Sequence, residues 1–96
     1  MNARALVARN LRRLRVRKGL SQENLAVDAR IDRTYVSRLE RGLENPTVAV
    51  LERLAKALGV QIVEFFAIPR RGEAPPQPLR SGRRPRGWRA DGADGE

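Results

Sequence analysis

The chain has 96 residues, and 20 Lys and Arg against 11 Asp and Glu give it a formal charge of +9. This length suits one small domain. The absence of Cys and His excludes a disulfide framework, a thiol nucleophile, a histidine base and the usual nitrogen and sulfur metal ligands, so we expect no metal and no cofactor. No apolar run forms a secretory signal or a membrane span of roughly 18 residues, which favours a cytoplasmic protein that binds no membrane. The positive charge is typical of a nucleic-acid partner, although an arginine-rich proteome gives the same balance.

The first two predicted helices meet near residue 20. Val7, Leu11 and Leu14 are three and four residues apart, which places them on one face of a helix. Gly19 is a typical C-cap and ends this helix. Ser21 is a typical N-cap and begins the second helix.

The third and fourth predicted helices also have clear limits. Asp32 is an N-cap candidate for the third, which ends at Gly42, and Pro46-Thr47 precede the fourth, which ends at Gly59. The apolar face of the fourth helix consists of Val48, Leu51, Leu54, Ala55 and Leu58. A further apolar run after residue 61 predicts a short fifth helix, in which we expect Ile62 and Phe66 to fill the core.

Residues 69–96 differ in composition from the rest. They hold five of the six Pro, and Leu79 and Trp88 are their only large apolar residues. Such a segment buries too little apolar surface to offset its ordering entropy, so we predict a disordered tail, either without a role or in contact with phosphates. The fold class is therefore all-α, with a five-helix domain over 1–68 and a disordered Arg/Pro/Gly-rich tail over 69–96.

The central segment carries the most specific pattern. Two predicted helices run from Ser21 to Gly42 with a short turn between them, and Leu39-Glu40-Arg41-Gly42 and Asn45-Pro46-Thr47 follow in order. This arrangement resembles the helix-turn-helix domain of the phage-repressor family, the Cro and cI-like or XRE-type regulators. The resemblance implies a phage-repressor-like fold, double-stranded DNA as the partner and a homodimer on a palindromic site.

A narrower resemblance is to the controller proteins of restriction–modification systems, through Asp32-Arg33-Thr34-Tyr35-Val36-Ser37. Two positions depart from the pattern. Arg30 lies in the turn, where the family usually has Gly, and a residue with a Cβ in that conformation costs about 1 kcal/mol. Glu44 stands where controllers often carry a basic residue, so no DNA contact is transferred to it.

The third helix is the predicted recognition helix. At about 100° per residue, Val36 and Leu39 face inward and Arg33 and Tyr35 flank that stripe. The predicted base contacts are Arg33, Thr34, Tyr35, Ser37 and Arg38, because the N-terminal part of this helix enters the major groove and arginine pairs with guanine through two hydrogen bonds. A solvated basic face is the alternative.

Four residues are predicted phosphate contacts: Gln22, Arg41, Asn45 and Thr47. The resemblance assigns this role to Gln22 at the start of the second helix. Asn45 and Thr47 precede the fourth helix, and plain helix capping is their alternative.

Two further pairs are predicted. Arg15 and Glu40 each border the core stripe of a helix, and the resemblance implies the same structural ion pair. Because related domains dimerise through the fifth helix, we expect Val63 and Phe65 at a two-fold dimer contact; burial of the whole helix in the core is the alternative.

Together these features predict a sequence-specific transcriptional regulator that acts on RNA polymerase at a promoter, its own included. The alternative is an antitoxin-type protein whose tail binds a toxin and whose DNA-binding domain represses their operon. An enzyme is not expected, because Glu23, Asp28 and Glu52 show no spacing that builds a catalytic site.

Overall fold

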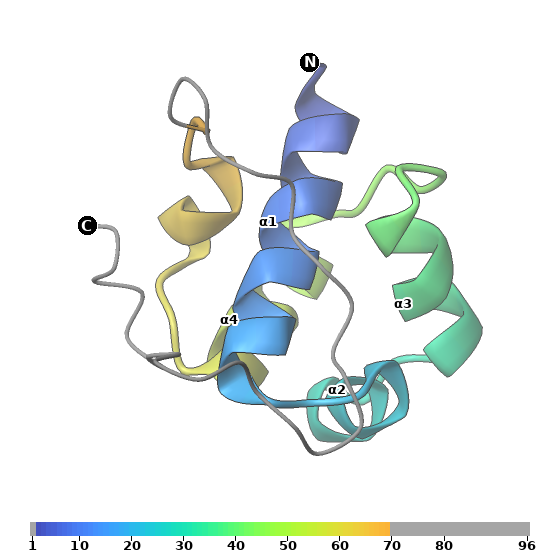
Figure 1. The fold of residues 1–96 in the computed structure, drawn as a ribbon. Helices are drawn as coiled ribbons and strands as arrows, with labels where there is room; N and C mark the ends of the chain where they lie inside the picture. The colour runs from blue at the N-terminus through green and yellow to red at the C-terminus, as the bar shows by residue number, and fades with distance from the viewer. Residues whose placement is uncertain (1, 70–96) are drawn as a thin grey trace.

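The computed structural model describes residues 2–69, and this part of the chain is helical without strands (Figure 1). Its elements are α1 (Ala3–Lys18), α2 (Gln22–Ala29), α3 (Arg33–Glu40), α4 (Val48–Leu58) and the 3-10 helix η1 (Ile62–Phe66). The predicted all-α class is confirmed. The predicted count of five helices holds only in part, because residues 2–69 form four α-helices and their last element is a 3-10 helix. The predicted tail lies outside the described residues.

The helix limits follow from local capping groups. The Ser21 hydroxyl accepts a hydrogen bond from Asn24 N at 3.0 Å, and the Asp32 carboxylate accepts one from Thr34 N at 2.8 Å. Gly19 ends α1 in a left-handed conformation, with φ at 80°. These caps satisfy backbone groups that a helix end leaves unpaired. The helices therefore begin and end at the capping residues that the sequence indicated.

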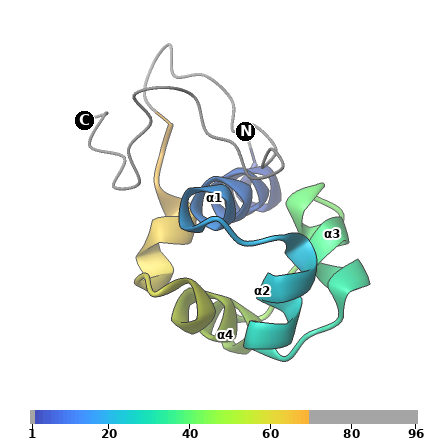
Figure 2. The same ribbon diagram turned by 60° about the horizontal axis from the view of Figure 1, so that its bottom comes forward.

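The core lies between α1 and the four later elements. Figure 1 shows α1 with η1 on one side and α3 on the other, and α2 below. Figure 2 shows α2 and α4 side by side, in agreement with their contacts. The buried apolar residues are Val7, Leu11, Leu14, Leu25, Ala26, Ala29, Val36, Leu39, Leu51, Leu54, Ala55, Leu58 and Phe65. This core packs α2 against α3 and α4, packs α3 against α1, and leaves the outer face of α3 in solvent.

The prediction for η1 is wrong for its two phenylalanines. Phe65 is fully buried in the core, whereas Phe66 is 43% exposed. The cause is the winding: a 3-10 helix has three residues per turn, so Ile62 and Phe65 share the inner face, while an α-helix would pair Ile62 with Phe66. Val63, three residues before Phe66, is 65% exposed and shares the outer face. Phe65 is therefore not available as a dimer contact.

Residues 2–69 contain no helix with the length and apolar character that crossing a membrane requires.

Candidate nucleic-acid interface

The turn between α2 and α3 is built on Arg30, which has φ 60° and ψ 48°. Arg30 N donates to Val27 O at 3.2 Å, and Ile31 N donates to Ala26 O at 3.0 Å. Within residues 2–69, Arg30 is the one residue other than Gly with a positive φ. The turn keeps the left-handed conformation despite the Cβ, at a cost of about 1 kcal/mol.

Helix α3 presents a polar face opposite its buried one. Val36 and Leu39 are buried, and the side chains predicted to contact bases lie elsewhere on the helix. Arg33, Thr34 and Arg38 are exposed, and Tyr35 and Ser37 are half-buried. The structure thus places Arg33, Thr34 and Arg38 on the outer surface of one short helix, whereas Tyr35 also packs against the core.

Arg38 has a partner beyond the end of α3. Its Nε donates to Glu44 Oε2 at 2.7 Å, and both side chains keep part of their surface in solvent. The Glu44 carboxylate also acts on Tyr35. Burial raises the pKa of the Tyr35 hydroxyl above its usual value, and the negative charge of Glu44 raises it further. Both effects favour the protonated hydroxyl, which can donate a hydrogen bond.

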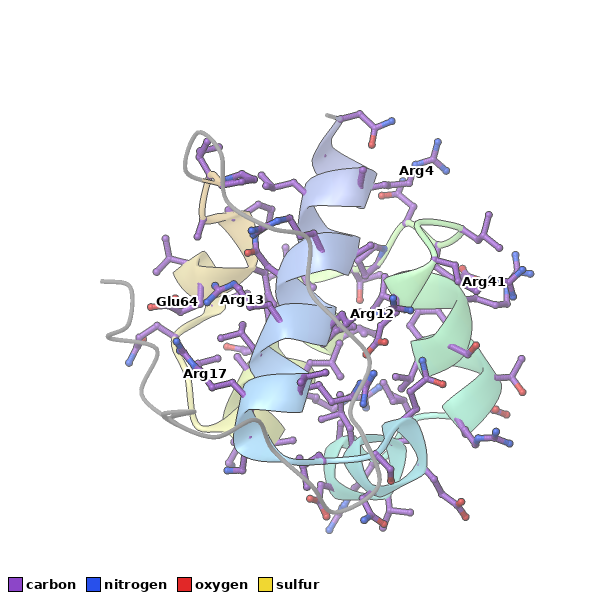
Figure 3. The ribbon with its side chains drawn as sticks, in the orientation of Figure 1. Arg4, Arg12, Arg13, Arg17, Arg41 and Glu64 are labelled. Carbon is purple, nitrogen blue, oxygen red and sulfur yellow. The ribbon has the colours of Figure 1, made fainter. Side chains whose placement is uncertain are left out.

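The predicted phosphate contacts lie at the start of α2 and in the segment that joins α3 to α4. Arg41 is exposed at the end of α3 and points outward (Figure 3). Asn45 is exposed in the following loop. Thr47 caps α4, with its hydroxyl accepting from Val50 N at 3.1 Å. The side-chain amide of Gln22 donates a hydrogen bond from Nε2 to Glu40 Oε1 at 3.0 Å. Thr47 and Gln22 thus both have partners within the domain. The sequence had suggested helix capping as an alternative for Thr47, but it gave no sign that Gln22 would bind Glu40.

Glu40 joins three helices. Arg15 binds its carboxylate through two hydrogen bonds, Nε to Oε2 at 2.5 Å and Nη2 to Oε1 at 3.0 Å. Arg12, which leans from α1 toward α3 in Figure 3, adds a contact to Oε1 at 3.4 Å. Arg15 also donates to Leu20 O at 2.8 Å. Gln22 also donates to Glu40 Oε1. The buried Glu40 carboxylate therefore fixes the start of α2 and the end of α3 to α1.

The geometry agrees with a known family. The family model for helix-turn-helix domains matches residues 11–65, which run from α1 through η1. The chain belongs to the helix-turn-helix family. Its relatives include regulators and controllers. The uncharacterised HTH-type transcriptional regulator y4dJ of Sinorhizobium fredii is 50% identical over 65 residues, which cover 68% of this chain and 84% of the relative.

Two solved controller structures are similar to this helix-turn-helix chain. The restriction–modification controller protein C.AhdI from Aeromonas hydrophila is 41% identical, with a TM-score of 0.64 over 66% of this chain and 96% of that one. The controller C.Esp1396I, solved as a tetramer in complex with its natural 35 base-pair operator, is 38% identical. Its TM-score is 0.64 over 69% of this chain and 87% of that one.

Asn10 is a buried polar residue of α1 that sequence reasoning missed. It is fully buried, and its Nδ2 donates to Phe65 O and to Ala67 O, both at 2.9 Å. Its Oδ1 accepts from Arg13 Nε at 3.2 Å. Arg13 also approaches Glu64 of η1, at 3.9 Å (Figure 3). An Asn among the apolar positions of α1 was the available signal, but nothing local in sequence identifies carbonyls so far along the chain.

Proposed function

We propose that this helix-turn-helix protein is a sequence-specific DNA-binding transcriptional regulator. The observation that carries the proposal is the solvent-exposed side of α3, where Arg33, Thr34 and Arg38 are exposed while Val36 and Leu39 are buried. A helix held by its inner face on a small core is able to enter the major groove with its first two turns. Bidentate pairing of arginine with guanine supplies about 1–3 kcal/mol of discrimination per base pair.

In this proposal, the elements around α3 contact phosphates. Gln22 lies at the N-terminus of α2, and Asn45 and Thr47 precede the N-terminus of α4. Backbone N–H groups at helix starts favour anions, and Arg41 adds a positive charge at the end of α3. These contacts would set the orientation of the domain on DNA, and the base contacts of α3 would select the sequence.

The regulator acts as a homodimer through η1. Val63, Phe66 and Ile68 are 65%, 43% and 76% exposed. They belong to η1 and the residues directly after it, and η1 lies on the side of α1 away from α3 (Figure 1). Burying such side chains on a second copy releases apolar surface from water. Two-fold symmetry then matches a palindromic operator with half-sites about one helical turn apart. Phe66 takes the role that the sequence had suggested for Phe65.

A dimer bound at a promoter would either block RNA polymerase or recruit it, and the proposal includes no catalytic step. Likeness to restriction–modification controllers favours action on the protein's own promoter. Such a role places the protein in the compartment that holds the DNA. None of the relatives named above is an antitoxin, so the comparisons give no support to that alternative.

Binding to DNA from immediately upstream of the gene tests the proposal, against shuffled DNA of equal composition at low and high salt. We expect a preference for the upstream DNA that survives high salt, because base contacts do not depend on counterion release. Equal binding to both duplexes that collapses with salt would contradict sequence-specific regulation at this site.

Replacing Arg38 by Ala tests the base contacts directly. Affinity for the upstream DNA should fall by about 1–3 kcal/mol, because a bidentate pair with guanine is lost. Affinity for shuffled DNA should fall much less. Equal losses on both duplexes would show that Arg38 binds phosphate only.

A further inference from the structure

Arg38 and Glu44 form a closed unit at the end of α3. Gly42 N donates to Leu39 O at 3.1 Å, and Leu43 N donates to Arg38 O at 3.0 Å. The left-handed conformation of Gly42, with φ at 74°, turns the chain so that these bonds form. Glu44 follows directly, and its carboxylate accepts from Arg38 Nε at 2.7 Å. The loop therefore binds Arg38 by its backbone carbonyl and by its side chain.

This arrangement leaves a defined edge of the guanidinium unoccupied. The planar group has five N–H donors, of which Nε carries one and Nη1 and Nη2 carry four. Within residues 2–69, Glu44 is the partner that the structure gives to this side chain, through Nε alone. The Nη1–Nη2 edge keeps the two parallel donors that guanine O6 and N7 accept.

The position of the carboxylate also matters for phosphates. Glu44 is a negative charge on the surface that carries the proposed DNA contacts, and its effect on the pKa of Tyr35 places its charge near that side chain as well. An unpaired Arg38 could turn toward any phosphate, and such a contact carries no sequence information. An acidic partner beside it opposes that contact and so favours discrimination over general affinity.

We propose that Glu44 is a positioning residue for sequence discrimination: its carboxylate holds Arg38 by Nε, presents the Nη1–Nη2 edge to a guanine, and opposes pairing of Arg38 with phosphate. This inference rests on the proposed function, since it concerns how the same helix selects DNA.

The test begins with a duplex that wild-type protein enriches from a random-sequence pool. Dissociation constants are then measured for that duplex, for each single base-pair change in it, and for a shuffled duplex, over a range of salt concentrations. The variants are Glu44→Gln, Arg38→Ala and the double Arg38→Ala/Glu44→Gln. Glu52→Gln is the matched control, because it removes the same charge from an exposed position on α4. Thermal unfolding of each variant verifies that it is folded.

We expect Arg38→Ala to abolish discrimination at one base pair, and Glu44→Gln to lower it there about tenfold, within the range that one bidentate pair provides. Glu44→Gln should bind the shuffled duplex more tightly, with a log-log salt slope steeper by about 0.9, since the released Arg38 gains a phosphate. In the Arg38→Ala background, the same change at Glu44 should not alter discrimination at that base pair. Glu52→Gln should match wild type.

Three outcomes would overturn the inference while the proposed function stands. Glu44→Gln could leave discrimination at every base pair unchanged, which would reduce Glu44 to a surface charge. Glu44→Gln could lower discrimination by the same factor in the Arg38→Ala background, which would mean that Glu44 acts through a residue other than Arg38. Arg38→Ala could leave every base pair discriminated as before. Failure of wild-type protein to enrich any sequence would instead contradict the proposed function, and this inference would fail with it.

Discussion

Glu40 and Glu44 are four residues apart and both form ion pairs with arginine, but their surroundings differ. The Glu40 side chain is fully buried and accepts hydrogen bonds from Arg12, Arg15 and Gln22. The Glu44 side chain is 28% exposed, and its arginine is 46% exposed. The same chemical pair therefore serves two purposes, one inside the domain and one on the surface that faces the proposed partner.

Water accounts for the difference. A buried carboxylate without partners costs several kcal/mol, so the donors around Glu40 are needed wherever the fold exists. An exposed pair contributes only about 0–1 kcal/mol, because each ion is nearly as stable in water. The Arg38–Glu44 pair can thus be removed at little cost to the fold, whereas Arg15 cannot leave Glu40 without unfolding.

The largest expected effect is the loss of the buried charge. Glu40→Gln removes the charge that compensates Arg15, so the free energy of unfolding should fall by about 3–5 kcal/mol. For a domain of this size that is most of the total stability. Urea unfolding followed by circular dichroism measures the change, and Glu52→Gln serves as the exposed control. A loss below about 1 kcal/mol would mean that the two pairs are equivalent.

A double variant sharpens this result. Arg15→Met together with Glu40→Met replaces both ions by apolar side chains, which removes the uncompensated charge as well as the pair. We expect it to be more stable than Glu40→Gln alone. If it is less stable, the hydrogen bonds to Arg12 and Gln22 outweigh the buried charges.

Asn10 extends the comparison to a buried group without charge. Asn10→Asp keeps the shape but removes the two N–H donors that bind Phe65 O and Ala67 O, so the free energy of unfolding should fall by about 2 kcal/mol. Asn24→Asp makes the same change at an exposed position of α2 and should have little effect. Equal urea midpoints for the two variants would contradict a stabilising role for the hydrogen bonds that Asn10 donates.

Arg30 is an exposed arginine that affects the stability of the domain through its left-handed backbone conformation. Arg30→Gly relieves the left-handed strain and should raise the free energy of unfolding by about 1 kcal/mol. Urea unfolding measures this gain, and Arg30→Ala, which keeps the Cβ, is the matched control. A gain of the same size in both variants would assign the effect to the charge instead of the turn.

The smallest effect is on Tyr35, the one tyrosine of the chain. Its phenolate absorbance should titrate at a pKa above the usual value, and Glu44→Gln should lower that pKa only part of the way, since burial is the larger cause. The folded state holds the proton more tightly than the unfolded state, so the free energy of unfolding falls as pH rises past the unfolded-state pKa. An unchanged pKa in Glu44→Gln would place Glu44 away from Tyr35 in solution.

The sequence was sufficient where the signal is local. Ser21, Asp32 and Thr47 cap the helices that follow them, because a cap acts on the next turn of the same chain. The outward face of α3 followed from helical spacing for the same reason. The pairing of Arg38 with Glu44 was missed because it crosses a loop, where spacing of three or four residues no longer predicts contact.

Two other features depend on geometry that residue types do not encode. Apolar residues at 62, 63, 65 and 66 fit either winding, so only the packed structure decides that Phe65 is inside and Phe66 outside. Asn10 depends on carbonyls more than fifty residues away, and the amide of Gln22 serves Glu40 although its position also suits phosphate. These partners are set by packing of α1 against η1 and α3.

The bonds from Asn10 set a lower limit on the length of the folding unit. Its side chain needs the carbonyls of residues 65 and 67, so a chain cut after α4 would retain every helix of the proposed DNA-contacting surface but lose both acceptors of Asn10 and the buried ring of Phe65. The helices proposed to bind DNA are thus completed by a segment that lies outside the proposed DNA-contacting surface. Truncation from the C-terminal side is expected to be tolerated down to about residue 68. A shorter chain is expected to destabilise α1, at the N-terminal end, because Asn10 loses its acceptors.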